Sequence, residues 1–300
     1  MPDIPVWNKC DNRCLMCANR PGFSRPPSGR YRLKNQIRRF ESYLSGRKEA
    51  YAKNSEDLRA LNLTGGEPTL NPDFLKLLAY FRKRARGGEL TLLTNGRSFA
   101  DPVFASAALR TAKAPFAVAV SLHGSTPVSH DAVTGVPGSF AAALKGMRNI
   151  CAHKGRGQTL EIRLVLHRRT IKGLKNTLLL LLREFAGCRG WRAVALHYEP
   201  EGRALRDLSL ALRLETSAAE VNSVSGLIRR FREFRLYHFP LCALKKELRR
   251  ISRVSLPLED RVYPKPCSSC AVKASCPGIT RRYCARFGPA PAGFLKALKR

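Results

Sequence analysis

The chain has 300 residues, of which 44% are hydrophobic, which excludes a disordered chain and leaves room for one barrel-like domain with a small extension, or for two ordinary domains. Lys and Arg number 54 against 22 Asp and Glu, so the formal net charge is +32. The first residues show no secretory pattern, and the longest aliphatic run, 178–182, is far too short to cross a bilayer, so we expect a cytoplasmic protein without a membrane partner.

The excess of positive charge has two interpretations. A strongly basic surface attracts polyanions and acidic peptides and speeds their association, which makes nucleic acid one candidate partner. No single compact basic motif stands out in the sequence, so the charge is equally consistent with a basic surface that serves no particular partner.

Short apolar segments alternate with amphipathic segments along most of the chain. The predicted strands are 4–7, 58–63, 89–94, 116–122, 159–166 and 193–198. The predicted helices are 34–45, 72–86, 101–111, 139–153, 174–185 and 217–234. Such alternation implies parallel strands with right-handed crossovers, and apolar strands suit a sheet covered on both faces. We therefore predict an α/β fold, a partial (β/α)6 TIM-like barrel; a doubly wound open sheet would show similar alternation.

The alternation of strands and helices ends at about Arg235, where prolines, basic residues and cysteines replace it. We predict a barrel domain over residues 1–234 and a small cysteine-rich C-terminal module over residues 235–300. Polar and glycine-rich motifs follow several of the predicted strands, which is where α/β barrels place their chemistry.

Ten cysteines are present, and most fall into two groups near the two ends of the chain. In a cytoplasmic protein, where thiols stay reduced, such groups favour metal binding or catalysis over disulfides. Cys151 and Cys188 lie between the groups, and we expect both to pack as small hydrophobic side chains.

The N-terminal group has the spacing C-x3-C-x2-C and consists of Cys10, Cys14 and Cys17. Three thiolates can each hold one iron of a four-iron cluster and leave the fourth iron open to a ligand. A zinc site usually has four protein ligands, and no fourth Cys or His lies nearby in the sequence. Zinc is nevertheless the alternative that the motif leaves open.

Residues 7–17, WNKCDNRCLMC, resemble the signature of the radical S-adenosylmethionine (radical SAM) superfamily. Met16 stands where that family usually has an aromatic residue. Later motifs match the family in order after successive strands, and the resemblance covers roughly residues 5–198. These motifs are Gly65-Gly66-Glu67-Pro68, Thr94-Asn95-Gly96, and Ser121-Leu122-His123-Gly124 followed by His130-Asp131 and Thr134-Gly135.

The resemblance implies an enzyme that carries a [4Fe-4S] cluster on its three N-terminal cysteines. In that family the open iron binds the amino and carboxylate groups of S-adenosylmethionine. One electron, delivered by a reductase such as a flavodoxin or ferredoxin, cleaves the sulfonium. The resulting 5′-deoxyadenosyl radical abstracts a hydrogen atom from the substrate, while the protein positions the reactants and excludes water.

The matched motifs supply candidate residues for binding S-adenosylmethionine. Glycines such as Gly65 and Gly66 let the backbone approach a ligand closely. Glu67 and the exposed backbone around it and Pro68 suit the ammonium group. Further candidates are Asn95 and Ser121 for ribose hydroxyls and Arg163 for the methionine carboxylate. Asn95-Gly96 is equally a turn sequence, and Arg163 is equally a surface residue.

The C-terminal group supplies four thiols, enough for a four-iron cluster or a zinc ion. Three of them have the spacing C-x2-C-x5-C, and a fourth precedes them; they are Cys267, Cys270, Cys276 and Cys242. The arrangement is similar to the auxiliary-cluster modules of several radical SAM families, including those that modify peptides. Cys284 competes with Cys242 as the fourth ligand, and structural zinc remains an alternative.

The predicted function is therefore a radical SAM enzyme in the maturation of a peptide or protein, with a probable second [4Fe-4S] cluster. A radical SAM enzyme that modifies RNA is the alternative that the charge favours. A hypothesis of another class is a non-catalytic protein that binds zinc and nucleic acid.

Overall fold

The computed structural model describes residues 2–19, 29–47, 60–85, 87–200, 204, 208–255, 258–289 and 294–299. The contacts within the chain divide it into two compact units. Unit 1 comprises Met1–Leu122, Thr126–Ile162 and Gly187–Trp191. Unit 2 comprises His123–Ser125, Arg163–Ala186 and Arg192–Arg300.

The described strands form an eight-stranded sheet whose order follows the chain from β1 to β8. Parallel pairing joins β1 (Asp3–Trp7), β2 (Ala60–Gly65), β3 (Glu89–Thr94) and β4 (Phe116–Ser121). It also joins β6 (Trp191–His197), β7 (Phe234–Tyr237) and β8 (Ser252–Arg253), while β5 (Gln158–Leu166) runs from unit 1 into unit 2. Sequential parallel strands linked by helices confirm the predicted α/β fold of the partial-barrel type.

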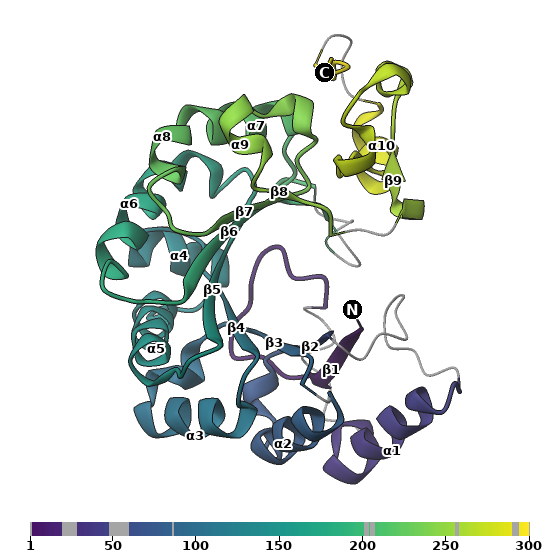
Figure 1. The fold of residues 1–300 in the computed structure, drawn as a ribbon. Helices are drawn as coiled ribbons and strands as arrows, with labels where there is room; N and C mark the ends of the chain where they lie inside the picture. The colour runs from purple at the N-terminus through teal and green to yellow at the C-terminus, as the bar shows by residue number, and fades with distance from the viewer. Residues whose placement is uncertain are drawn as a thin grey trace. The chain divides into compact units, whose positions relative to one another are not determined.

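Four helices of unit 1 follow one another along the outer side of β1 to β4 (Figure 1). They are α1 (Leu33–Leu44), α2 (Phe74–Arg84), α3 (Pro102–Ala112) and α5 (Ser139–His153), and the short α4 (Pro127–Thr134) precedes α5. Helix α2 buries Phe74, Leu77, Leu78 and Phe81, which share one face at the spacing of an amphipathic helix.

Unit 2 contains α6 (Leu174–Glu184), α7 (Leu214–Ser223), α8 (Ser225–Ile228) and α9 (Lys246–Arg249). After β8 come the antiparallel pair β9 (Arg261–Val262) and β10 (Ile279–Thr280) and the helix α10 (Arg281–Phe287). None of the helices in the described part of the chain has the length and apolar character that a membrane span requires.

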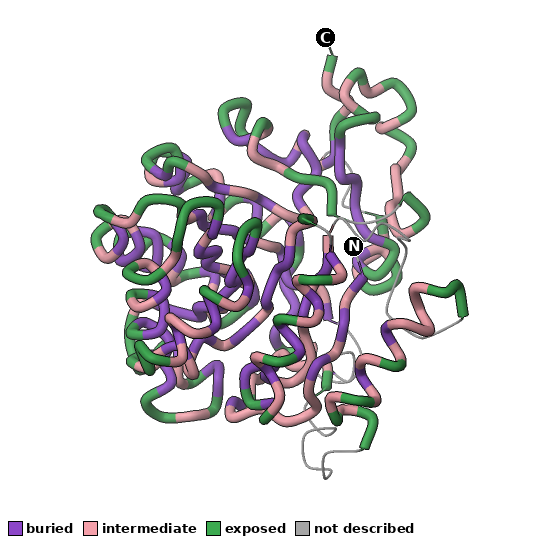
Figure 2. Tube along the Cα trace, turned by 60° about the horizontal axis from the view of Figure 1, so that its bottom comes forward, coloured by how far each residue is buried: buried purple, intermediate pink, exposed green. Residues whose placement is uncertain are grey.

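The buried residues follow the strands and the inner faces of the helices (Figure 2). In β1, Ile4 and Val6 are fully buried while their neighbours are partly exposed, so this strand alternates as a half-covered strand does. In β4 the first five residues are all buried, which fits a central strand with both faces covered.

The predicted helix 217–234 is wrong in its second half. Helix α7 ends at Ser223, α8 covers one turn to Ile228, and Phe234 begins the additional parallel strand β7. The strand has only four residues, in which buried and partly exposed side chains alternate, and the arginines before it resemble the polar face of a helix. The sheet therefore extends past residues 234 and 235, and the division into two domains there stays a prediction.

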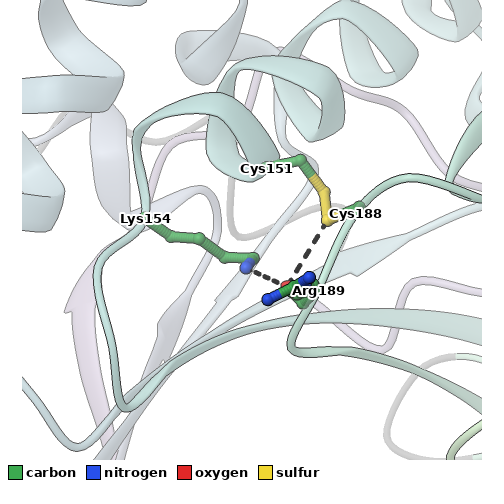
Figure 3. The surroundings of a disulfide bond; sticks show 4 residues. All are labelled: Cys151, Lys154, Cys188 and Arg189. Atoms are coloured by element: carbon green, nitrogen blue, oxygen red, sulfur yellow. Dashed lines mark hydrogen bonds between the residues drawn. A yellow bond between two sulfur atoms is a disulfide. The ribbon is translucent and has the colours of Figure 1, made fainter.

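Cys151 and Cys188 form a disulfide, so the expectation of two separate packed thiols is wrong (Figure 3). Cys151 lies in the last turn of α5, which leads to β5, and Cys188 lies just before β6. Because β5 and β6 are neighbours in the sheet, the segments that precede them come together. The Lys154 ammonium also donates a hydrogen bond to the Arg189 carbonyl beside the disulfide.

Candidate functional site

The three N-terminal cysteines lie in the loop that follows β1, and all three thiols are partly buried. The backbone N–H of Asn12 donates to the Cys10 sulfur at 3.4 Å, and the N–H of Cys17 donates to the carbonyl of Cys14 at 3.1 Å. The second bond closes a turn between the last two cysteines. The donor set is three thiols on one short loop, which fits a four-iron cluster with one open iron.

The backbone of this cysteine loop is held by the end of α4. The N–H of Arg13 donates to Thr134 O at 2.7 Å, and the N–H of Leu15 donates to Val133 O at 2.9 Å. Gly135 has a φ of 68°, and a Cβ on it would lie 3.1 Å from Arg13 O. A glycine is therefore needed here, because the loop passes directly over the end of the helix.

Asp131 fixes the helix that follows α4. Its carboxylate accepts hydrogen bonds from Gly138 N, Ser139 Oγ and Phe140 N, at 2.7, 2.7 and 2.8 Å, around the N-terminus of α5. Burial alone would raise the pKa of Asp131, but these bonds hold the pKa below its ordinary value. The Thr-Gly pair of the sequence motif thus supports the cysteine loop, whereas Asp131 of the His-Asp pair holds the start of α5.

Glu67 joins the carboxyl ends of β2 and β3. Its Oε1 accepts from the Thr69 N–H at 3.1 Å and from the hydroxyls of Thr69 and Thr94 at 2.7 Å each, and its Oε2 accepts from Asn95 N at 2.7 Å. The side chain is buried, and burial raises its pKa although the hydrogen bonds act in the opposite direction. The predicted contact with the ammonium group of S-adenosylmethionine stays a prediction.

Asn95 ties the end of β3 to the cysteine loop. Its Nδ2 donates to the Asp11 carboxylate at 2.6 Å, and its Oδ1 accepts from the Arg97 N–H at 2.9 Å. The Arg97 guanidinium pairs with Asp11 at 2.9 Å and also donates to the Asp11 carbonyl at 2.7 Å. Both ends of the Asn95 amide are used within the chain, and its predicted ribose contact stays a prediction.

Gly65 makes close packing of two strands possible. It has a φ of 145°, and a Cβ on it would lie 2.2 Å from the carbonyl oxygen of Trp7, its register partner on β1. The N–H groups of Gly66 and Glu67 donate to Trp7 O and Lys9 O, at 2.7 Å each. The close approach that Gly65 allows is therefore to the backbone of β1 in the described chain, and the predicted approach to a ligand stays a prediction. Pro68 is buried and starts a single 3-10 turn.

Two further predicted residues lie at or near strand ends. Ser121 is the last residue of β4 and is partly exposed in unit 1, the unit that also holds Glu67 and Asn95. Arg163 is partly exposed on β5 in unit 2, close enough to His238 to lower the pKa of that imidazole. Their contacts with S-adenosylmethionine stay predictions.

Burial raises the pKa of the Cys10 thiol to about 12, and the negative charges of Glu67, Asp11 and Cys14 act in the same direction. Without a metal, this thiol is protonated at neutral pH. Cationic iron would reverse that preference, because a metal ion stabilises the thiolate that binds it.

The C-terminal group lies in unit 2 around a pocket. The walls of this pocket include all four predicted ligands, Cys242, Cys267, Cys270 and Cys276. Backbone N–H groups point at two of the sulfurs: Leu241 and Gly278 donate to Cys276 Sγ, and Leu298 donates to Cys270 Sγ, at 3.4 Å each. Hydrogen bonds to sulfur are among the interactions that tune iron–sulfur clusters.

The pocket separates the two competing candidates for the fourth thiol. Burial raises the pKa of Cys242, and the nearby Cys276 and Cys270 raise it further. Burial also raises the pKa of Cys284, but its charged neighbour is Glu199 and it does not line the pocket. The four thiols stand around the pocket walls. Within the residues that the structure describes, no three His, Cys, Asp or Glu side chains converge tightly enough to hold one metal ion.

The region that carries the cysteine loop matches a known family. Residues 4–181 match the model of the Radical SAM superfamily, which is more than half of the chain. The chain belongs to the radical SAM superfamily. It is therefore an enzyme, and its cofactors are a [4Fe-4S] cluster and S-adenosylmethionine.

Curated relatives match short parts of this radical SAM chain. The mycofactocin maturase MftC of Mycobacterium ulcerans is 38% identical over 92 residues, which cover 31% of this chain and 23% of the relative. The GTP 3′,8-cyclase of Edwardsiella ictaluri is 33% identical over 100 residues, which cover 33% of this chain and 28% of the relative. The matches thus span about a quarter of the length of these relatives.

Solved structures share the fold at low sequence identity. The structure of Streptococcus suis SuiB bound to S-adenosylmethionine gives a TM-score of 0.57 at 14% identity, covering 78% of this chain and 49% of SuiB. A radical SAM methyltransferase from Sphaerobacter thermophilus gives 0.51 at 14% identity, covering 78% of this chain and 64% of that protein. These likenesses show the radical SAM fold.

Two residues that position the cysteine loop of this radical SAM enzyme are not predicted from the sequence. They are Asp11 and Arg97. Both lie inside or beside motifs that were identified, since Asp11 stands between the first two cysteines and Arg97 follows Asn95-Gly96. Their opposite charges are the one signal in the sequence that points to the pair, and only the fold brings them to 2.9 Å.

Proposed function

We propose that this radical SAM enzyme acts in the maturation of a peptide or protein, and that Cys242, Cys267, Cys270 and Cys276 hold a second [4Fe-4S] cluster. One observation carries the proposal. All four thiols lie after the family-matched residues 4–181, and all four line one pocket. The cysteine module is thus an addition to the shared catalytic fold.

The relatives point to the same class of substrate. Sequence identity to the mycofactocin maturases of two Mycobacterium species is 34–38% over about 100 residues. SuiB, whose structure is also known in complex with the precursor peptide SuiA, shares the fold with a TM-score of 0.56. A fold alone does not determine a substrate, so the peptide assignment rests on the maturase similarity together with the cysteine module.

A cluster suits the C-terminal pocket better than a zinc ion does. Zinc holds its thiolates about 2.3 Å from one centre, so the four sulfurs must converge. In a four-iron cluster each thiolate binds a different iron, and the sulfurs stand further apart. Here the four thiols are distributed over the walls of one pocket, which favours a group that each thiol binds at a different iron.

At the N-terminal site the chain positions the reactants. Cys10, Cys14 and Cys17 would hold the first cluster, and the contacts of Asp11 and of α4 fix the loop that carries them. When bound, this cluster and S-adenosylmethionine supply the 5′-deoxyadenosyl radical that abstracts hydrogen from the substrate. The electron would come from a reductase such as a flavodoxin or ferredoxin.

The test uses anaerobically reconstituted enzyme and every short peptide that sequencing of the neighbouring genes finds. Mass spectrometry would follow the peptide mass and the release of 5′-deoxyadenosine. We expect one peptide to change mass only when enzyme, reductant and S-adenosylmethionine are all present. Cys10→Ala should abolish 5′-deoxyadenosine formation, whereas Cys267→Ala combined with Cys270→Ala should abolish peptide turnover only. Cleavage of S-adenosylmethionine without any change in the peptides would contradict the substrate assignment.

RNA modification is the second candidate, and the net charge of +32 favours it. RNA binding that serves this function should weaken steeply with salt, because binding releases counterions, and RNA should stimulate 5′-deoxyadenosine formation. Salt-sensitive binding without such stimulation would reflect the basic surface alone and would leave the peptide proposal standing.

A further inference from the structure

A polar group of unit 2 that has no part in either cysteine site lies at the carboxyl ends of β6 and β7. These strands pair in parallel, with Leu196 opposite Tyr237, so the residues that follow them are neighbours. His238 directly follows β7, and Glu199 follows β6 by two residues. The carboxyl ends of the strands are where barrels of this class bind their substrates.

The backbone of His238 is in a conformation that few side chains adopt. Its φ is 65°, in the left-handed region, and Lys113 is the one other residue besides glycine with a positive φ in the described part of the chain. Residues in this region persist where the surrounding structure holds them, and they cluster at ligand-binding and active sites. The conformation places the imidazole against β6.

The hydrogen bonding of His238 defines its tautomer. Its Nδ1 lies 3.3 Å from the carbonyl oxygen of His197, and a carbonyl can only accept, so Nδ1 carries the hydrogen. Burial lowers the pKa of His238 to about 4, so the ring is neutral at pH 7 and Nε2 is an acceptor. Among the described residues, Nε2 has no hydrogen-bond partner, and the His238 side chain is 18% exposed.

Glu199 places a second acceptor beside the first. Its Oε1 lies 3.7 Å from His238 Nδ1, too far for a hydrogen bond, and its side chain is only 10% exposed. Burial raises the pKa of Glu199 to about 7, while a hydrogen bond with Thr280 and the charge of Arg282 oppose that rise. The group thus presents an imidazole lone pair next to a buried carboxyl that also has a hydrogen bond with Thr280.

We propose that His238 Nε2 and the Glu199 carboxyl form a substrate subsite that accepts hydrogen bonds from a peptide backbone N–H or side-chain amide. The inference rests on the proposed peptide substrate and adds to it the residues that orient the peptide. Two adjacent acceptors match neighbouring N–H donors, which a peptide offers at every residue except proline.

The test compares two equimolar hexapeptide pools on the reconstituted enzyme, one with free backbone N–H groups and one fully N-methylated. His238→Asn removes the Nε2 acceptor, while asparagine tolerates the left-handed backbone and can still donate to His197 O. Wild type should retain the unmethylated pool about three- to tenfold more strongly, the worth of one hydrogen bond. His238→Asn and Glu199→Leu, which has no acceptor, should each lose most of that preference, and the matched control His153→Asn, at an exposed histidine, should keep it.

Equal retention of both pools by wild type would overturn the subsite, as would an unchanged preference in folded His238→Asn and Glu199→Leu. If wild type retains neither pool, no peptide binds, and the proposed function falls with the inference. Diethyl pyrocarbonate gives a second measurement, because it acylates neutral, accessible imidazole nitrogen. His238 should react at pH 7 and be protected by the unmethylated pool; a reaction at exposed His153 but none at His238 would contradict the proposal.

Discussion

The carboxylate of Glu67 shows how a residue of a recognisable motif can serve the fold. It accepts four hydrogen bonds from three residues while only 1% of the residue is exposed. The sequence predicts that a carboxylate lies at the end of β2 beside the cysteine loop. It does not predict which groups donate to it, because Thr94 and Asn95 reach it only through the pairing of β2 with β3.

Glu67→Gln should therefore destabilise the protein even without S-adenosylmethionine. The amide nitrogen of glutamine would face one of the donors that now bond the carboxylate. The substitution therefore loses a hydrogen bond to a charged group and leaves a buried N–H unpaired. We expect a loss of about 2–4 kcal/mol in the free energy of unfolding, measured by urea denaturation. Glu247→Gln, at an exposed glutamate, should change stability little, and equal effects of the two substitutions would contradict the account.

Glu199 predicts a pH dependence of stability. Burial raises its pKa from 4.5 to about 7, so the folded chain takes up the proton at a higher pH than the unfolded chain does. Its contribution to stability is therefore complete below about pH 4.5 and is lost as the pH rises through 7. The stability of wild type relative to Glu199→Gln should increase from pH 8 to pH 5.5 in urea denaturation. A difference that stays constant over this range would refute the assignment.

Among the elements, the pairing of β1 with β2 depends on Gly65. A Cβ there would lie 2.2 Å from Trp7 O, and the backbone φ of 145° is unfavourable for any other residue. Gly65→Ala should lower the free energy of unfolding by at least about 3 kcal/mol, since the cost of steric overlap with the β1 backbone adds to the cost of the strained φ. Gly187→Ala is the matched control, because a Cβ there meets nothing within 4 Å. Similar melting temperatures for both variants would be inconsistent with this role.

The disulfide joins the end of α5 to the segment before β6. It closes a loop across a sequence separation of 37 residues, and in the chain-entropy model such a cross-link stabilises by about 3–4 kcal/mol. Cys151→Ser should lose about this amount in urea denaturation without reductant, whereas Cys284→Ser, at a free cysteine, should not. With reductant present, wild type and Cys151→Ser should become equally stable. A difference in their free energies of unfolding that persists would mean that the disulfide does not account for the stability of wild type.

The elements show where prediction from sequence succeeds and where it stops. Three strands can be predicted because each is an apolar run bounded by a polar motif. These motifs are the cysteine loop, Glu67 and Asn95, and the three N-terminal ligand candidates are predictable with them. Strand β7 is short and follows several arginines, which hides it within a predicted helix. The disulfide and the pair of Asp11 with Arg97 join residues far apart in sequence, so only the completed fold reveals them.

At the scale of the whole molecule, the two cysteine groups belong to different compact units. The loop with the N-terminal group is held by contacts within unit 1, through Asp11, Asn95 and α4. The C-terminal group is held within unit 2, by residues around its own pocket. Because each loop depends on its own unit, loss of metal at the C-terminal group should leave the first cluster in place.

The most direct test of this account is the metal content per chain after anaerobic reconstitution, measured for iron and zinc together. Two four-iron clusters predict about eight irons and no zinc in wild type. Cys267→Ala combined with Cys270→Ala should lower the content to about four irons, and Cys284→Ser should leave it unchanged. About four irons with one zinc in wild type, or an unchanged iron content in the double variant, would contradict the second cluster.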